Sequence, residues 1–574
     1  MADTSGLSPY MFPLEGGLVL NKSNFAIQPG MAYELENFEP DTSGGYRRIN
    51  GHTQWGLDVP FTNTNVEPVL MTAFYLGEVI AARGESVYRS TNSSSELTLG
   101  ITDADTTIIV RDTEGFSETG TLALGSPLTY GVEYVTYTGK NNTEFTGCSR
   151  GALGTIAKEH PAKTEIVQAW TEIESGRVGA KKYSFVRGAL VGTLKLIYCD
   201  GVNPVSVWDG TSVTQITGPL SPADPQYLTD FKNAGFYAGM SANPQEIIYT
   251  APASIDGFDP ALGAGSFVID EPVTGMTVFR DTLYIFSANR IYRLTGSSQA
   301  DYVLAPITRD IGCRNGWTIK EFAGDIVFLG PDGLRTIAGT EKIGDVELGT
   351  ISKPVQELFL KKNKVAEFEA LVIPDKTQYR IFFSDSNVID NSTTGVICSR
   401  KQEGYEFSTT KNIKPYSSDT ESYRGEYYVM MGTFDGKIYR AEQGSTFDGQ
   451  EIIGRYRSPD ITAGDPGIRK AFQRVIINYA PEGEMETDLF LRYDYEDSKV
   501  PRPAPYPFDS TQVVALYGKS IYGQDTYGGQ TDPLVRQPVE GSGFSVALRV
   551  IDRGLSLPYS LKGFQLEFTA AARR

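Results

Sequence analysis

Few residues in this sequence have the types and the spacing that catalysis or metal binding requires. The two histidines are His52 and His160, and neither stands beside a serine or cysteine in the local pattern of a catalytic triad. His160 lies in the polar segment KEHPAK, which we expect to be an exposed loop. The sequence contains no HExxH, CxxC, calcium-loop or phosphate-loop motif. It therefore predicts no catalytic residue, no metal site and no bound cofactor.

A glycoside hydrolase is the enzymatic alternative, because most such enzymes need a pair of carboxylates at the scissile bond. The chain has 70 Asp and Glu residues, so pairs that lie close by chance carry no information. Sialidases repeat the pattern Ser-x-Asp-x-Gly-x-x-Trp, which the turns of this chain do not match. We expect that the protein is not an enzyme.

The charge and the cysteine content also limit the functions to be expected of this protein. The formal net charge is −18, whereas a sequence-independent nucleic-acid binder needs a basic surface to neutralise phosphates. The acidity indicates either solubility alone or a surface that lets DNA pass without binding it. The four cysteines stand far apart, which predicts isolated buried thiols and synthesis in a reducing cytoplasm. No apolar run of about 18 residues and no secretory signal occur, so we expect no stable membrane insertion.

The elements that would position functional residues are mainly strands, in a hairpin pattern that recurs along the chain. Each copy has an apolar strand, a polar turn with Gly or Asn, and a second strand. Steps of about 40 to 53 residues between most copies are typical of β-propeller blades. The copies are Val79–Ser90, Leu196–Asp209, Phe236–Thr250, Leu283–Leu294, Ile326–Ile337, Tyr379–Cys398 and Tyr427–Arg440. Seven copies predict about seven blades.

Three of these hairpins end in Tyr-Arg. Arg89, Arg293 and Arg440 would form a ring of anion-binding sites if they pointed to a common space. The alternative, which we favour, is a packing Tyr beside a solvated Arg, because neighbouring residues of a strand point to opposite faces.

The first step between hairpins is longer, because a Thr- and Gly-rich segment with short alternating strands separates the first two copies. Removing about 75 residues restores a step close to the others. Surface loops tolerate such insertions because the entropy of loop closure grows slowly with length. We therefore predict a small inserted β-domain over residues 93–169.

Beyond Gly449 the hairpin pattern stops and longer strands with alternating polarity follow. These are Phe472–Tyr479, Leu489–Tyr495, Phe544–Ile551 and Leu561–Phe568. They predict a C-terminal β-sandwich, interrupted by a long Pro-, Gly- and Tyr-rich loop of the kind that is often functional. Tyr517, Tyr522 and Tyr527 in this loop would pack against a neighbouring subunit or another partner, which we favour, or stack on a sugar ring.

The two ends of the chain resemble tail proteins of short-tailed bacteriophages. The N-terminal run GLVLNKSNFAIQPGMAYELENFEPDTSGGYRRINGHTQW is similar to their opening, and the C-terminal run VEGSGFSVALRVIDRGLSLPYSLKGFQLEFTAAARR to their close. The inserted segment, with EYVTYTGKNNTEFTGCSRGALGTIAKEH, resembles a small β-module found in several phage structural proteins. With the propeller period, the chain is similar to the tail nozzle proteins of podoviruses, also called packaged-DNA stabilisation or tail hub proteins.

This resemblance implies a structural virion protein, made in the host bacterial cytoplasm and located at the distal end of the tail. Family members form a homohexameric ring below an adaptor or tube protein and offer outer surfaces to fibres or spikes. Their channel passes genomic DNA without sequence-specific binding and retains the packaged genome until DNA ejection. The alternative is a receptor- or glycan-binding tail fibre or adhesin built on a propeller.

We predict an all-β fold with four regions. An extended segment, residues 1–75, contacts the tail assembly, and one of its strands is a candidate for closing the last blade. The propeller of about seven blades covers residues 76–92 and 170–449, interrupted by the inserted β-domain at 93–169. A β-sandwich with the long loop covers residues 450–574.

Overall fold

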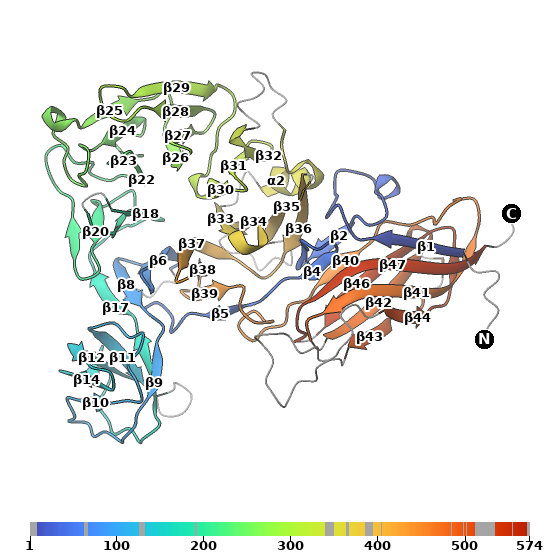
Figure 1. Ribbon diagram of the computed structural model, residues 1–574, viewed down its shortest axis with the longest axis horizontal. Helices are drawn as coiled ribbons and strands as arrows, with labels where there is room; N and C mark the ends of the chain where they lie inside the picture. The colour runs from blue at the N-terminus through green and yellow to red at the C-terminus, as the bar shows by residue number, and fades with distance from the viewer. Residues whose placement is uncertain are drawn as a thin grey trace. The chain divides into compact units, whose positions relative to one another are not determined.

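The computed structural model describes residues 8–61, 67–125, 132–189, 192–338, 349–362, 367–384, 394–402, 404–483, 485–496, 499–500, 502–510, 534–553 and 555–570. The chain divides into two compact units. The end unit comprises Met1–Thr53, Lys320–Lys414 and Ala441–Arg574, and the blade unit comprises Gln54–Ile319 and Pro415–Arg440. Strands dominate both units (Figure 1), and α2 (Gln356–Lys362) is a short helix. The predicted all-β class is confirmed. Among the described residues, no helix has the length and apolar character to cross a membrane.

The blade unit contains antiparallel sheets of mostly four strands, built mainly from strands that follow one another in sequence. The first sheet combines β6 (Val69–Tyr75), β7 (Glu78–Arg83), β8 (Ser86–Ser90) and β17 (Thr171–Glu174). The second contains β18 (Ser184–Gly188), β19 (Lys195–Cys199), β20 (Ser206–Trp208) and β21 (Val213–Gln215). The third contains β22 (Tyr227–Phe231), β23 (Ala234–Ala238), β24 (Glu246–Tyr249) and β25 (Gly265–Val268). The fourth contains β26 (Val273–Phe279), β27 (Thr282–Ser287), β28 (Ile291–Thr295) and β29 (Val303–Thr308). A fifth contains β37 (Pro415–Tyr423), β38 (Glu426–Thr433) and β39 (Ile438–Ala441), with β5 (His52–Gln54) at its edge.

These sheets are propeller blades that pack face to face. The first strands of neighbouring blades lie together, in the order β37, β6, β18, β22 and β26. Separate apolar cores fill the spaces between successive blades, for example around Tyr198 between the first and second sheets and around Phe236 between the third and fourth. The end unit contains two further sets of strands of this kind, β30–β32 and β33–β36. Together with the five sheets above they make seven sets among the described residues, the number that the repeat predicts.

The last blade meets the first, which is how a propeller ring closes. Trp55 and Val59, on the segment that precedes the first blade, donate backbone hydrogen bonds to Ile438 O (2.7 Å) and Gly436 O (2.9 Å) beside β39. Trp55 also packs in one buried cluster with Phe74 of the first blade and Ile438 of the last. An N-terminal segment thus completes the edge of the final blade, as the sequence predicts.

Arg83, buried at this junction, ties three backbone segments together. Its guanidinium donates to Val59 O (2.5 Å), Glu67 O (2.9 Å) and Asp435 O (3.1 Å). Gly436 follows with φ +91°, and a Cβ there would lie 2.0 Å from the Arg83 guanidinium carbon. Only glycine therefore fits beside the arginine at this turn.

We expect Arg83→Met to lower the free energy of unfolding by about 2–4 kcal/mol, because it leaves up to three buried carbonyls without their donor. Urea unfolding measures this loss. Gly436→Ala should cause a comparable loss through the clash, whereas the exposed Arg424→Met should change stability by less than about 0.5 kcal/mol. Equal stabilities of the Arg83 and Arg424 variants would contradict the role of this clamp.

The Tyr-Arg strand ends follow the packing interpretation. Tyr88 and Tyr292 are buried. Arg89 pairs with Glu78 at 3.1 Å, and Arg440 pairs with Glu426 at 3.1 Å, in each case the acidic residue at the start of the preceding strand. Two of the three arginines are therefore engaged within their own hairpins.

The inserted segment has a core of its own, formed by residues such as Leu122, Tyr137 and Phe145. One sheet contains β9 (Ser94–Glu96), β11 (Gly120–Leu124), β12 (Glu133–Tyr137), β15 (Ser149–Ala152) and β16 (Glu165–Ala169). A smaller sheet contains β10 (Ile108–Ile109), β13 (Gly139–Lys140) and β14 (Glu144–Thr146). The insertion is thus a small β-module with its own apolar centre.

In the end unit, the first and last strands of the chain lie side by side (Figure 1). The register runs from Ser8↔Phe568 to Pro13↔Gly563. This seven-stranded sheet contains β1 (Ser8–Pro13), β3 (Phe38–Pro40), β4 (Tyr46–Arg48), β41 (Lys470–Pro481), β44 (Leu534–Pro538), β45 (Ser542–Gly543) and β47 (Tyr559–Ala570). The long strand β47 pairs with β41 on one side and with β1 and β4 on the other.

The second large sheet of the end unit has nine strands. In order, these are β33 (Glu367–Ile373), β34 (Gln378–Ser384), β35 (Gly395–Arg400), β36 (Tyr405–Thr410), β2 (Glu34–Glu36), β40 (Arg455–Arg457), β46 (Val546–Arg553), β42 (Met485–Tyr493) and β43 (Tyr506–Ser510). Strand β2 joins a blade-like set to sandwich strands, because it pairs with β36 in parallel and with β40 in antiparallel register. The two large sheets pack through one core, with Tyr456 stacked on Phe564 at 5.8 Å. They form a β-sandwich.

The three-stranded set of β30 (Lys320–Phe322), β31 (Asp325–Gly330) and β32 (Gly333–Thr336) and the helix α2 share this same core. The predicted boundary near residue 450 is therefore crossed by a continuous sheet and a continuous apolar core. The physical cause is β2, which supplies hydrogen bonds to strands from both predicted regions.

Candidate functional site: a buried ion network at the N-terminal hairpin

The hairpin β3–β4 is short and held by its turn. The Asp41 side chain accepts a hydrogen bond from Ser43 N (3.0 Å), and Gly44 and Gly45 have φ of +88° and +87°. Asp41 also accepts from Ser560 Oγ (2.7 Å) and Lys562 Nζ (2.9 Å) on β47. Burial alone would raise the pKa of Asp41, but these hydrogen bonds lower it to about 2. The hairpin is thereby tied to the last strand of the chain.

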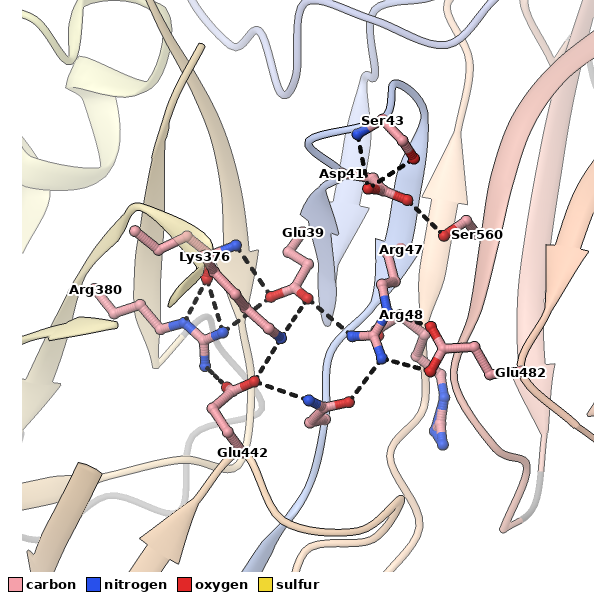
Figure 2. Close-up of polar contacts among 12 residues, drawn as sticks. Glu39, Asp41, Ser43, Arg47, Arg48, Lys376, Arg380, Glu442, Glu482 and Ser560 are labelled. Carbon is pink, nitrogen blue, oxygen red and sulfur yellow. Dashed lines mark hydrogen bonds and ion pairs between the residues drawn. The ribbon is translucent and has the colours of Figure 1, made fainter. Parts of the chain in front are cut away.

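Glu39, on β3, is the centre of a charged network inside the end unit. It is only 2% exposed. Its carboxylate accepts from Arg47 (3.0 Å), Lys376 (2.6 Å) and Arg380 (2.9 Å), and from the Gln378 amide (3.1 Å). Figure 2 shows Glu39 between Arg47 on one side and Lys376 and Arg380 on the other. One carboxylate therefore joins the hairpin to β34 and to the turn that precedes it.

Two further carboxylates complete the network (Figure 2). Glu442 lies 2.5 Å from Lys376 Nζ and 2.8 Å from Arg380 Nη1. Glu482 accepts two hydrogen bonds from Arg47, at 2.5 Å from Nε and 2.7 Å from Nη2. Asn50 bridges the two halves by accepting from Arg47 (2.9 Å) and donating to Glu442 (3.0 Å).

The charges in this network balance, because three carboxylates face three cations. Burial alone would raise the pKa of Glu442, but Arg380 and Lys376 lower it to about 2. Burial alone would lower the pKa of Arg47, but the hydrogen bonds and charges of Glu482 and Glu39 raise it. Glu442 and Arg47 are thus held in their charged forms at neutral pH. A general acid for glycoside cleavage needs the opposite shift, a raised carboxyl pKa, so this network serves as a lock between segments.

Arg48 carries a second contact beside this network. Its side chain has no exposed surface, and Nε lies 2.9 Å from Asp552 Oδ2. The guanidinium also donates to Ser445 O (2.9 Å), Ile452 O (3.4 Å) and Ser556 O. Burial raises the pKa of Asp552 to about 7, although Arg48 opposes the shift. Neighbouring residues of β4, Arg47 and Arg48, therefore fasten two sets of C-terminal segments.

We expect the network to weaken in acid. The pKa of Glu442 is lowered from 4.5 to about 2 on folding, so its stabilising contribution is present above pH 4.5 and is lost as the pH falls through 2. Urea unfolding between pH 7 and pH 2 tests this. Glu442→Gln should be less stable than the wild type at pH 7 and should lose less stability on acidification. An unchanged pH profile in this variant would contradict the assignment.

The residues singled out in the sequence lie apart from this network. His52 is buried and stacks on Phe447 at 4.8 Å, and burial lowers its pKa to about 4. The expectation of an exposed loop at His160 is wrong: its Nε2 lies 2.9 Å from the buried Glu133, which also accepts from Arg150. The polar residues of KEHPAK gave no indication of this buried contact between His160 and Glu133. The four cysteines are buried thiols that form no disulfide bond, as predicted. Tyr517, Tyr522 and Tyr527 lie outside the described residues.

Sequence reasoning missed the ion network because its members are far apart in the chain. Glu482 and Arg47 are 435 positions apart, and Arg380 and Glu39 are 341 positions apart. The local signal was the run EPDTSGGYRR, in which charged residues stand on both sides of a Ser-Gly-Gly turn. Among the described residues, no group of three or more His, Cys, Asp or Glu side chains could hold a metal ion.

No protein-family model and no curated protein matches the sequence. Solved structures to which the chain is similar include Hsv2 of Kluyveromyces lactis, with a TM-score of 0.30, 11% identity, and coverage of 60% of this chain and 98% of that one. They also include an exo-β-1,3-galactanase of Phanerochaete chrysosporium, with a TM-score of 0.24, 11% identity, and coverage of 91% and 100%. A third is a family 43 arabinoxylan arabinofuranohydrolase of Bacillus subtilis, with a TM-score of 0.22, 11% identity, and coverage of 90% and 99%. Because these TM-scores lie below 0.5, the likenesses assign neither activity nor ligand to this chain.

The comparison nevertheless corrects the expectation that the protein is not an enzyme. Glycoside hydrolases are among the structures that the chain matches, so a general exclusion of enzymes does not stand. The physical reason is that the exclusion rested on missing local motifs. Two carboxylates that folding brings together from distant strands leave no such motif in the sequence.

Proposed function

We propose that this chain is a structural protein of a short bacteriophage tail, of the nozzle type. In this proposal, six copies form a ring at the distal end of the tail, below an adaptor or tube protein and in contact with fibres or spikes. The ring extends the DNA channel and retains the packaged genome until ejection. It passes the DNA without sequence-specific binding.

The observation that carries the proposal is the pairing of the two chain ends. The N-terminal and C-terminal runs that resemble phage tail proteins meet in one sheet, where β4 pairs with β47. Strand β1, which precedes the N-terminal run, also pairs with β47. The contact between Arg48 and Asp552 fastens the same two runs, and the ion network around Glu39 ties the N-terminal run to Lys376, Arg380 and Glu482. Strand β47 lies between β41 on one side and β1 and β4 on the other, so every interstrand hydrogen bond on both of its edges opposes its extraction. Such a body suits a part that must hold pressure.

The charge of the chain also supports the proposal. A net charge of −18 gives a surface that repels phosphate groups, so DNA would slide along it without adhering. A strongly basic channel wall in the assembled ring would contradict this part of the proposal.

Immunogold labelling of phage particles from the source of this chain tests the proposal. We expect label at the distal tip of a short tail, and six copies per particle by quantitative mass spectrometry. Label along projecting fibres would instead support receptor or glycan binding. Absence of the chain from purified particles would overturn a virion role.

A further inference from the structure

One half-exposed face of the nine-stranded sheet gathers arginines in a chain that is otherwise strongly acidic. Arg457 of β40 lies directly opposite Arg549 of β46. On either side, Glu34 stands opposite Arg457 and Phe490 stands opposite Arg549. Like charges directly opposite each other on antiparallel strands destabilise a sheet. The pairing of Arg457 with Arg549 is therefore a cost, which the ion pairs of Arg457 with Glu496 and of Arg549 with Glu34 offset.

Arg492 is a third arginine of this group. It lies two residues from Phe490 on β42, and no carboxylate among the described residues forms an ion pair with it. Burial lowers the pKa of Arg492, and the charges of Arg502, Arg549 and Arg457 lower it further. Among the described residues, two carboxylates form ion pairs with these arginines. Glu34 lies 3.2 Å from Arg549, and Glu496 lies 3.1 Å from Arg457. Arg457 also feels the charge of Asp460. Among the described residues, Arg492 and Arg502 are therefore the two members of this group that have no carboxylate in an ion pair.

Aromatic rings flank the arginines. The Arg457 guanidinium lies over the Tyr33 ring at 4.8 Å, and Tyr33 is 37% exposed. Beside Glu496, Tyr495 stacks on Phe25 with centroids 6.2 Å apart, although these rings are 45% and 75% exposed. We call Tyr33, Phe25, Tyr495 and the four arginines Arg457, Arg492, Arg502 and Arg549 the arginine–aromatic patch.

The turn that presents Tyr495 has an unfavourable backbone. Asp494, Tyr495 and Glu496 have φ of 50°, 57° and 61°, three successive left-handed residues without a glycine. Hydrogen bonds hold this conformation, from Tyr495 N to Asp460 Oδ1 (3.2 Å) and from Phe544 N to Asp494 Oδ1 (2.6 Å). Strain that the surroundings enforce is concentrated at functional positions. The turn fixes an exposed ring next to the arginines.

We infer that the arginine–aromatic patch binds an acidic surface of a second copy of this chain. Exposed Arg, Tyr and Phe are the residues enriched at protein interfaces, where they supply most of the binding energy. The occupant follows from charge: outside the patch the chain is more acidic than its total of −18, so another copy offers the complementary surface. Contact between two different surfaces is heterologous, and a heterologous contact forms a ring when the rotation between copies closes. The inference rests on the proposed function, because that function requires a ring.

Nucleic acid is the competing occupant, since arginines beside aromatic rings also bind single strands. The acidity of the whole chain disfavours it, because a polyanion approaches against the net field. Assembly and single-strand binding of the same variants distinguish a second copy of the chain from nucleic acid.

Sedimentation velocity of the full chain at 50, 150 and 500 mM NaCl tests the inference. We expect the wild type to assemble, more weakly as salt rises. Arg457→Glu with Arg549→Glu should raise the dissociation constant more than tenfold, and Arg492→Gln should raise it at least threefold. Arg424→Glu is the matched control, because Arg424 is also exposed beside a ring, at 5.2 Å from Tyr423, and lies outside the patch. It should assemble as the wild type does.

Arg492→Gln separates binding from folding. Because Arg492 is surrounded by like charges, its loss should leave the melting temperature unchanged or higher while assembly weakens. A lower melting temperature with unchanged assembly would overturn the inference, as would a wild type that stays monomeric at every salt concentration. Binding of a fluorescent 20-nucleotide single strand that Arg492→Gln abolishes would overturn it in favour of nucleic acid. A ring at the tail tip that survives the double charge reversal would leave the nozzle proposal intact and reject only the patch.

Discussion

Replacing Glu39 with alanine should lower the free energy of unfolding by about 3–5 kcal/mol, the loss typical when one partner of a buried ion pair is removed. The cause is the number of cations that depend on this carboxylate. Arg47, Lys376 and Arg380 all donate to it within 3.0 Å. Glu442 and Glu482 remain in the variant, but two carboxylates then face three cations, of which Arg380 is buried and Arg47 and Lys376 are partly buried. Equilibrium urea unfolding at pH 7 measures the effect.

A matched control separates this loss from ordinary removal of a glutamate. Glu426 pairs with Arg440 at 3.1 Å, but its side chain is 67% exposed. Glu426→Ala should cost less than about 1 kcal/mol, as exposed pairs do. Glu39→Gln should lie between the two, because it keeps an acceptor oxygen but loses the charge. If Glu39→Ala and Glu426→Ala have the same stability, Glu39 is not the centre of the lock.

The strand content of this fold was predictable because it is encoded locally. The segment Val79–Ser90 contains β7 and β8, and Leu283–Leu294 contains most of β27 and β28. In both, apolar residues bounded by a polar turn specify a hairpin without information from elsewhere in the chain. The long strands β41 and β47 were found for the same reason, since their alternation extends over many residues.

Contacts between distant segments were not predictable in this way. Strand β2 has three residues, too few to show a period. It lies between β36 and β40, which are both more than 350 positions away from it in the sequence. Glu39 stands in a three-residue strand as well, and nothing near it indicates Lys376 or Arg380. His160 looked exposed because its neighbours are polar, while its partner Glu133 lies 27 residues away in another strand. A single sequence therefore predicts the hairpins, but not the strand pairs and side-chain contacts that connect distant hairpins.

Arg48→Met should also cost about 3–5 kcal/mol at pH 7, because it leaves Asp552 buried without its cation. Neither side chain of this pair has exposed surface. The three carbonyls of Ser445, Ile452 and Ser556 lose their donor in the same variant. Urea unfolding compares it with the wild type and with the double variant Arg48→Met, Asp552→Asn.

The pH dependence of Arg48→Met identifies the cause of its loss. Burial already raises the pKa of Asp552 to about 7 in the presence of Arg48, and removing the cation should raise it further. A carboxyl whose folded pKa lies above its unfolded value contributes stability at low pH, and this contribution is lost as the pH rises through the folded pKa. The stability of the single variant should therefore continue to fall as the pH rises above about 7, where that of the wild type levels off. The double variant has no carboxyl to ionise, so it should be flatter with pH and more stable than Arg48→Met above pH 7. If the second substitution restores nothing, the loss comes from the three carbonyls, and Arg48 acts on this core as a backbone donor rather than as a counter-charge.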